Sequence, residues 1–251
     1  MKENKYISGL ASVSFRQHSP LEILEATVAA NLSCIEWGSD VHAPCNDKAR
    51  LREIAEMQKE FGIVCSSYGT YFKLGATPIE ELERYIDAAN ILDTDILRIW
   101  CGTKCGDEYS LQEKQMLTEE CRKAAEIASR VGVTLCMECH KNTLTQKPED
   151  ALALMKEVDS SHFQMYWQPF QWQTKAENVA YAKAISDFTR NIHVFHWKGD
   201  QKLSLYDGID EWRCYLAQFS TPRTLLLEFM PDNSLSTLIT EAKALRDIIG
   251  E

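Results

Sequence analysis

Residues 134–167 read TLCMECHKNTLTQKPEDALALMKEVDSSHFQMYW and contain the pattern that decides the fold. A short apolar run, Thr134–Cys139, precedes a helical pattern that opens with a proline, Pro148–Val158, and a second apolar run follows at Gln164–Trp167. Strands that are apolar along their whole length are typical of parallel sheets, whose two faces are both covered. The segment therefore predicts a strand, a helix and a second, parallel strand.

The same unit recurs along the whole chain. The expected strands are Tyr6–Ala11, Cys34–Gly38, Ile63–Tyr68, Ile96–Cys101, Thr134–Cys139, Gln164–Trp167, Ile192–Trp197 and Thr224–Phe229. The expected helices are Leu21–Ala30, Asp47–Phe61, Ile79–Leu92, Ser110–Val131, Pro148–Val158, Lys175–Phe188, Ile209–Phe219 and Ser234–Ile249. Eight units of roughly 31 residues fit the size of an α/β barrel. We therefore expect one domain over residues 1–251, of the α/β class, folded as a (β/α)8 TIM barrel.

The main alternative is an open, doubly wound sheet that binds a dinucleotide. That fold places a GxGxxG turn after its first strand. Residues 8–13 read SGLASV and lack this motif. The barrel is therefore the better interpretation.

Composition and charge narrow the function classes. The formal net charge of −10 disfavours binding to a phosphate backbone, so we expect no nucleic-acid partner. The nine cysteines are odd in number, and several lie in apolar runs, which indicates free thiols in a reducing compartment. Residues 1–6 read MKENKY and contain no apolar signal region, and no apolar stretch approaches the ~20 residues of a membrane span. We expect a cytoplasmic protein that has no membrane partner and acts on a small molecule.

Polar residues end several of the expected strands, where barrel enzymes carry their active sites. Glu138, Gln168, His196 and Glu228 end the fifth to eighth strands, which form half of the barrel wall. Charged groups in apolar strands are costly unless they are paired or bound to a metal. Carboxylates with an imidazole suit a divalent ion. We expect these four residues to bind Mn²⁺, with Mg²⁺, Co²⁺ or Zn²⁺ as alternatives.

Further polar and aromatic side chains near strand ends are candidates for contact with the substrate. They are Glu36, His42, Trp100, His140 and Lys198. Trp100 could stack on the C–H face of a sugar. His193 lies inside the seventh expected strand, and we assign it a structural role.

These motifs resemble the sugar phosphate isomerase/epimerase family of xylose isomerase-like TIM barrels, which includes tagatose and psicose 3-epimerases, hydroxypyruvate isomerases and inosose dehydratases. The resemblance runs from Phe15-Arg16 to the final helix. It rests on the strand-end segments Ile35-Glu36-Trp37, Met137–His140, His193–Lys198 and Leu227-Glu228, and on Tyr206–Asp210. The family's metal set of Glu, Asp, His and Glu corresponds to Glu138, Gln168, His196 and Glu228. Gln168 departs from the usual aspartate, which implies weaker metal binding and a more electrophilic ion.

The resemblance implies a sugar isomerase or epimerase in which the metal polarises a carbonyl group. Glu138 and Glu228 would then remove and return the proton next to it, through an enediolate. A dehydratase or lyase acting on a keto-inositol or a 3-keto-glycoside would use the same site. A non-catalytic sugar-binding barrel and a DNA-repair enzyme of the endonuclease IV type are alternatives of other classes. Dimers and tetramers are common in similar proteins, so a homo-oligomer is left open.

Overall fold

The computed structural model describes residues 6–250, and eight parallel strands close into a barrel. The barrel strands are β1 (Ile7–Ala11), β2 (Cys34–Gly38), β3 (Val64–Leu74), β4 (Ile96–Cys101), β5 (Thr134–Glu138), β6 (Phe163–Trp167), β7 (Thr189–Val194) and β10 (Thr224–Leu227). The strand order around the barrel follows the chain, and β10 pairs with both β7 and β1. The predicted barrel fold is confirmed. Residues 1–5 and 251 of the expected domain lie outside the described residues.

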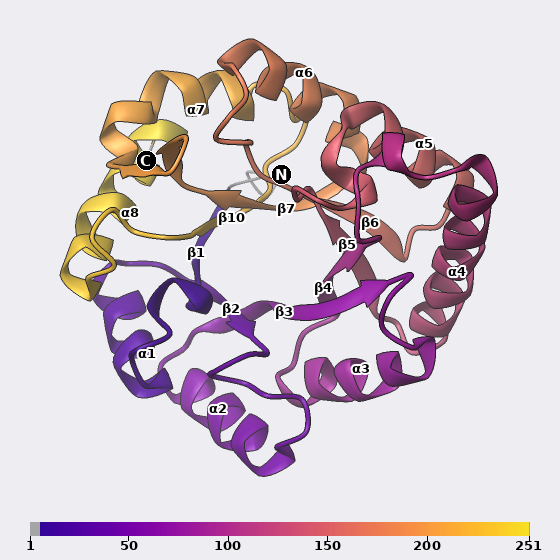
Figure 1. Ribbon diagram of the computed structural model, residues 1–251. Helices are drawn as coiled ribbons and strands as arrows, with labels where there is room; N and C mark the ends of the chain where they lie inside the picture. The colour runs from indigo at the N-terminus through magenta and orange to yellow at the C-terminus, as the bar shows by residue number, and fades with distance from the viewer. Residues whose placement is uncertain (1–5, 251) are drawn as a thin grey trace.

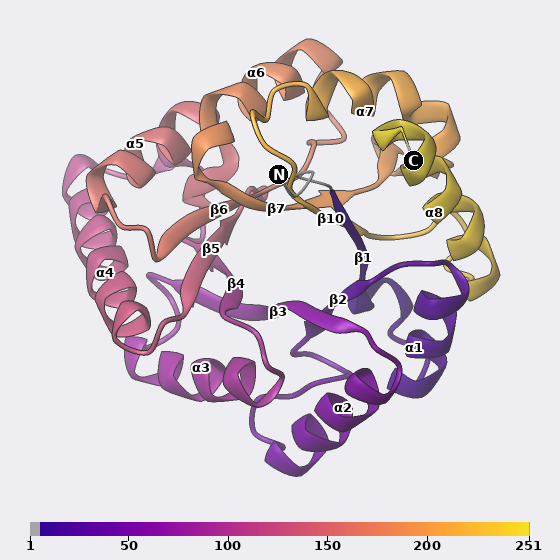
Figure 2. The ribbon, with the colours of Figure 1, turned by 180° about the vertical axis from the view of Figure 1, so that it is seen from behind.

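Eight helices surround the barrel, as Figures 1 and 2 show from opposite sides. They are α1 (Pro20–Ala29), α2 (Lys48–Glu60), α3 (Leu82–Ile91), α4 (Leu111–Arg130), α5 (Pro148–Val158), α6 (Lys175–Ile185), α7 (Ile209–Leu216) and α8 (Leu235–Ile249). Ser19 caps α1, and Ser110 caps α4, each through a reciprocal capping box that satisfies backbone N–H groups of the first turn. No helix within residues 6–250 is long and apolar enough to span a membrane. All nine cysteines are free.

The seventh expected strand differs from the structure in one respect that affects the site. The sequence predicts a strand over Ile192–Trp197, but β7 ends at Val194. The chain then leaves the barrel, and His196–Lys198 (β8) pairs with Gln201–Leu203 (β9) in an antiparallel hairpin. His196 therefore belongs to this hairpin and is not part of the barrel wall.

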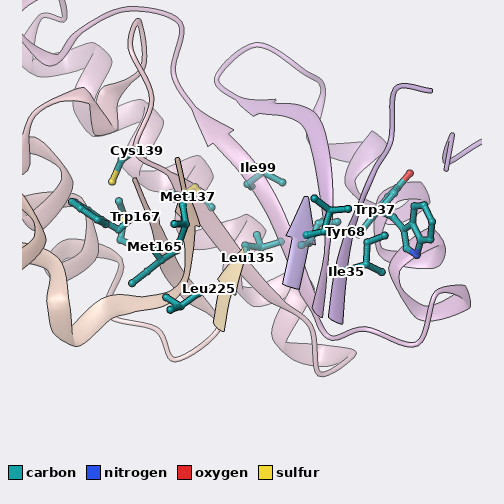
Figure 3. Close-up of a cluster of buried hydrophobic side chains, with 14 of the residues drawn as sticks. Ile35, Trp37, Tyr68, Ile99, Leu135, Met137, Cys139, Met165, Trp167 and Leu225 are labelled. Carbon is teal, nitrogen blue, oxygen red and sulfur yellow. The ribbon is translucent and has the colours of Figure 1, made fainter. Parts of the chain in front are cut away.

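Side chains alternate along each strand between the barrel interior and the surrounding helices. The outward residues pack under the helices in the main hydrophobic core, part of which Figure 3 shows around Ile35, Leu135, Met137 and Trp167. The inward residues form a smaller, separate cluster: Cys34, Ile96, Cys136, Tyr166 and Leu226. Each member of this inner cluster is followed two residues later by a polar residue: Glu36, Arg98, Glu138, Gln168 and Glu228. The pleat therefore places a polar layer directly above an apolar one, towards the carboxyl ends of the strands.

The close pairing of β1 with β2 depends on Gly9, which lies opposite Cys34. A Cβ at this position would lie 2.5 Å from the backbone oxygen of Cys34. We predict that Gly9→Ala lowers the free energy of unfolding by about 1–3 kcal/mol, as overpacking does. Urea denaturation measures the change. Gly132→Asn is the control, because Gly132 has a φ of +74°, which Asn tolerates, and a Cβ added there would have no atom within 4 Å. An equal loss in both variants would contradict this account.

Candidate active site

A cavity of about 230 Å³ lies above the polar layer, at the carboxyl ends of the strands. Drug-sized ligands occupy pockets of roughly 300–1,000 Å³, so this space fits a smaller molecule. Its lining combines carboxylates, cations and aromatic rings: Val13, Arg16, Tyr71, Arg98, Trp100, Glu138, His140, Lys141, Gln168, Phe170, Gln171, Trp172, Phe195, Trp197, Glu228 and Phe229. The position and the lining identify this cavity as the candidate active site.

Arg98 on β4 joins two of the buried carboxylates. Its Nε donates to Glu36 Oε1 at 3.0 Å, and its NH1 donates to Glu138. Trp100, two residues further along the same strand, donates its indole N–H to Glu138 at 2.5 Å. Burial alone would raise the pKa of Glu138, but Arg98 and His193 hold it well below its usual value. Glu138 is therefore an ionised carboxylate with two donors on one oxygen.

His193 on β7 lies at the centre of the polar layer and is fully buried. Its Nε2 contacts Glu36 Oε1 at 3.2 Å. Its Nδ1 lies 3.2 Å from Gln168 Oε1, 3.5 Å from Glu138 Oε1 and 3.6 Å from Glu228 Oε2. Burial disfavours the imidazolium, but the carboxylates around the ring raise the pKa of His193 to about 10. In the metal-free protein, His193 is therefore a buried cation.

Glu228, just beyond β10, differs from the other carboxylates because no cationic group within the described residues forms a hydrogen bond with it. Burial, with Glu138 nearby, raises the pKa of Glu228 to about 7. The next residue, Phe229, has a φ of +54°, a strained conformation for a residue with a side chain. The backbone N–H of Phe229 donates a hydrogen bond to Ser14 Oγ at 2.9 Å, which holds this turn in place. Glu228 thus faces the cavity as a carboxyl group that can exist in either protonation state near neutral pH.

Glu36 lies below the cavity, within the barrel interior. It accepts from Ser67 Oγ at 3.0 Å, and Ser67 in turn contacts the Tyr166 hydroxyl at 2.7 Å. Burial would raise the pKa of Glu36, but Arg98 and His193 lower it to about 2. Glu36, which the sequence suggested as a substrate contact, is fully buried and does not line the cavity. It instead orients the two cations above it.

Five of the predicted site residues do line the cavity: Trp100, Glu138, His140, Gln168 and Glu228. His42 does not, because its ring is buried between Ser12 Oγ, at 3.2 Å, and the backbone oxygen of His18, at 3.1 Å. His196 and Lys198 do not, because the β8–β9 hairpin carries them to a neighbouring cavity. The expectation that His196 lies beside Glu138 and Glu228 is therefore wrong in position.

His193 occupies the place that the sequence pattern assigned to His196. Strand periodicity could have identified His193. Residues three apart in a strand, such as His193 and His196, face opposite sides, and His193 lies two residues after Asn191, whose side chain points into the barrel. Arg98 was also missed, although it lies two residues after the inward Ile96. As the side chains stand, no three His, Cys, Asp or Glu residues in the described part of the chain form a ready metal site.

The buried pair of Glu36 and Arg98 yields a stability prediction. Glu36→Gln removes the carboxylate that accepts hydrogen bonds from Arg98 and His193, and the loss of these charge-assisted bonds should cost about 1.5–3 kcal/mol near pH 6. The folded-state pKa of about 2 is below the unfolded value of 4.5, so this contribution is present above pH 4.5 and is lost as pH falls towards 2. Urea denaturation at pH 6 and pH 3.5 should therefore show a smaller gap between variant and wild type at the lower pH.

Glu241 provides the control, because its pKa is raised by burial. The Glu241→Gln difference should change with pH in the opposite direction. A gap for Glu36→Gln that is the same at both pH values would contradict the assigned ion pair.

Comparison with proteins of known sequence shows one curated relative and one family model. The 3-dehydroshikimate dehydratase of Bacillus anthracis is 26% identical over 116 residues, which cover 46% of this chain and 41% of the dehydratase. The match therefore spans less than half of that protein's length. The family model for xylose isomerase-like TIM barrels matches residues 24–234.

Solved structures share the fold over nearly the whole chain. The probable 3-DHS dehydratase involved in petrobactin synthesis from Bacillus anthracis superposes with a TM-score of 0.80, at 19% identity, over 96% of this chain and 98% of that one. D-psicose 3-epimerase from Clostridium cellulolyticum H10, solved with D-tagatose, gives a TM-score of 0.70 at 14% identity, over 97% and 98%. A barrel protein from Mycobacterium smegmatis in complex with magnesium gives 0.72 at 13%, over 98% and 97%. The matched family model covers most of the sequence, and the chain belongs to the xylose isomerase-like TIM barrel family.

Proposed function

We propose that this protein is an enzyme that removes a proton from the carbon next to a carbonyl group in a small polyhydroxylated substrate, as sugar isomerases do. One observation carries the proposal: Glu228 faces the cavity as an acid–base group, beside a cluster of charged and polar donors. A general base should have a pKa near the working pH and lie within reach of the proton that it removes. Glu228 fits the first condition and is placed for the second.

We propose further that four of the surrounding side chains bind a divalent cation. Two ligand atoms that each lie about 2.1 Å from one ion, at roughly 90–110°, are about 3.0–3.4 Å apart. His193 Nδ1 lies 3.2–3.6 Å from oxygens of Gln168, Glu138 and Glu228, so each of these three pairs has about the spacing of two ligands of one ion. Binding would require loss of the Nδ1 proton and movement of the side chains, because they do not form a ready metal site as they stand. Glu36 on the opposite ring nitrogen matches the carboxylate that commonly orients a metal-bound histidine. When bound, such a metal would polarise the substrate's carbonyl group.

The two glutamates have different roles in this proposal. Glu138 is fixed as an ionised group by Arg98 and Trp100, so it positions ligands and does not exchange protons readily. Glu228 takes the proton and can return it to the neighbouring carbon on the same face of the substrate. This one-base arrangement favours isomerisation over epimerisation, because inversion of a carbon needs a second acid on the opposite face. Arg98, from the cavity wall, stabilises the negative charge that develops on the oxygen.

Dehydration is the second candidate, favoured by the dehydratase relative and by the charge of the cavity. Arg16, Lys141 and Arg98 all line it, and such cations suit a substrate with an acidic group. Glu228 would again take the proton next to the carbonyl group. The electron pair of the broken C–H bond would then expel a hydroxyl group from the next carbon, and Glu228 would return its proton to form water. Both candidates share the first step and differ only in the fate of the enolate.

Proton exchange with solvent tests the shared step. With Mn²⁺ and a panel of ketoses, keto-polyols and 3-dehydroshikimate, we expect deuterium incorporation or product formation for at least one compound. Mass spectrometry separates isomerisation, which keeps the mass, from dehydration, which removes one water. Glu228→Gln should lower the rate by at least 10²-fold, as expected for loss of a general base.

Glu60→Gln is the control, because Glu60 is an exposed glutamate of α2 that lines neither this cavity nor the neighbouring one. It should leave the rate near that of the wild type. A Glu228→Gln variant that keeps the full exchange rate would contradict the assignment of the base.

The metal assignment is tested by binding. Mn²⁺ at 100 times its Kd should stabilise the wild type by about 2.7 kcal/mol and raise its melting temperature. His193→Gln should remove this effect, whereas His196→Gln should keep it, because only His193 lies among the donors. Thermal melts in a chelator and in Mn²⁺ give the comparison. A shift that depends on His196 and not on His193 would overturn the assignment.

A further inference from the structure

A second cavity, of about 240 Å³, lies between the segment that leads into α6 and the first turns of α7. We propose that it is a binding site for a small oxyanion, either free or carried by a larger ligand, in which His196, Gln173 and Trp197 meet Lys175 and Lys198. This inference does not rest on the proposed catalytic function. Apart from Trp197, which lines both cavities, it concerns residues outside the candidate active site.

His196 gives the first argument. The residue is only 5% exposed, and its Nε2 has no hydrogen-bond partner within residues 6–250. The Nδ1 edge of the ring packs on Gly208. A Cβ added to Gly208 would lie only 2.5 Å from Nδ1, so the ring has little room to move. A buried polar atom without a partner costs about 1–3 kcal/mol. Because His196 lines the cavity, this unpaired nitrogen is a group whose bonding a bound ligand could complete.

Two more buried atoms of the same wall lack partners within the described chain. They are Gln173 Oε1 and Trp197 Nε1, and both residues line the cavity. Indole nitrogen can only donate, imidazole Nε2 donates in one of its tautomers, and the amide can turn its NH₂ group to either side. The indole therefore donates, the imidazole can donate, and Gln173 accepts as it stands and donates once its amide is turned. A ligand with several acceptor atoms can satisfy all three side chains.

Charge points to the same class of ligand. Lys175 and Lys198 line the cavity, with Glu211 as the carboxylate among its lining residues. Lys175 is also the first residue of α6, an 11-residue helix capped by Thr174, so the positive end of the helix dipole lies at this wall. Among the residues that line the cavity, two cations thus face one carboxylate, although Glu177 caps the same helix end, in a protein whose net charge is −10. Phosphate, sulfate or a carboxylate supplies both the negative charge and the acceptor oxygens.

The second cavity shares its inner wall with the candidate active site. Phe170, Gln171, Phe195 and Trp197 line both spaces. The oxyanion could therefore be a free ion, or it could be the acidic end of a molecule whose other end lies in the active site. The chemistry of the site is the same in both cases, and only the source of the anion differs.

Calorimetric titration of the full chain with inorganic phosphate, in a buffer without other oxyanions, tests the proposal. We expect saturable binding to one site, weakened roughly tenfold in Lys198→Met and in Lys175→Met, because each removes one charge-assisted contact. His196→Gln should also weaken binding. Lys183→Met is the control, because Lys183 lies on the exposed face of the same helix and does not line the cavity.

The outcomes are distinct. No heat of binding at millimolar phosphate, or equal affinity in Lys198→Met and Lys183→Met, would overturn the proposal. Displacement of bound phosphate by a phosphorylated ketose, but not by the unphosphorylated sugar, would support it and assign the anion to a substrate. Phosphate binding that neither compound displaces would support a site for a free ion. These measurements need no catalytic turnover, so failure of the proposed enzyme activity would not affect them.

Discussion

Three carboxylates and two cations share the interior of the barrel, and their balance governs the site. Arg98 and His193 are surrounded by Glu36, Glu138 and Glu228, which leaves one carboxylate in excess when all are ionised. Burial makes this excess charge costly, and the cost appears as the raised pKa of Glu228. A divalent cation that replaced the extra proton of His193 would bring the group to neutrality. The same imbalance accounts for the raised pKa of Glu228 and is the physical basis of the proposed cation site.

This arrangement follows from the period of two in the strands. On β2, β4, β5, β6 and β10 the inward position below the site residue is apolar, as at Cys136, and the next inward position is polar, as at Glu138. On β7 the residue below His193 is the polar Asn191, which donates to the Tyr166 hydroxyl. The apolar layer packs the lower part of the barrel, and the polar layer forms the floor of the cavity. Buried charges are tolerated there because they pair with one another within the closed sheet. The fold and the site thus depend on the same alternation.

The fold was predictable because each of its eight units carries its own apolar run and helical period. The polar ends of β5, β6 and β10 were predictable for the same reason, and Glu138, Gln168 and Glu228 do meet in one cavity. His196 was misplaced because the run from Ile192 to Trp197 contains no residue that marks the end of β7. The chain leaves the barrel at Phe195, where backbone pairing passes to the β8–β9 hairpin.

Other site residues were missed because their roles depend on partners far away in the sequence. Arg98 pairs with Glu36 and Glu138, which are 62 and 40 residues away, and no local pattern reports such contacts. His42 was assigned to the substrate, but it packs inside the loops that follow β1 and β2. Lys198 follows the hairpin away from the active site. Contacts between separate strands and loops, and not the strand ends themselves, decide these positions.

The central claim is that His193 is the hub of the active site. Anomalous diffraction from a crystal soaked in Mn²⁺ tests it most directly. We predict a single strong peak within bonding distance of His193 Nδ1, Glu138, Gln168 and Glu228, with Glu36 still bound to the other nitrogen of the ring. A peak at His196, or an unchanged contact between Arg98, His193 and the glutamates with no metal among them at saturating Mn²⁺, would contradict it.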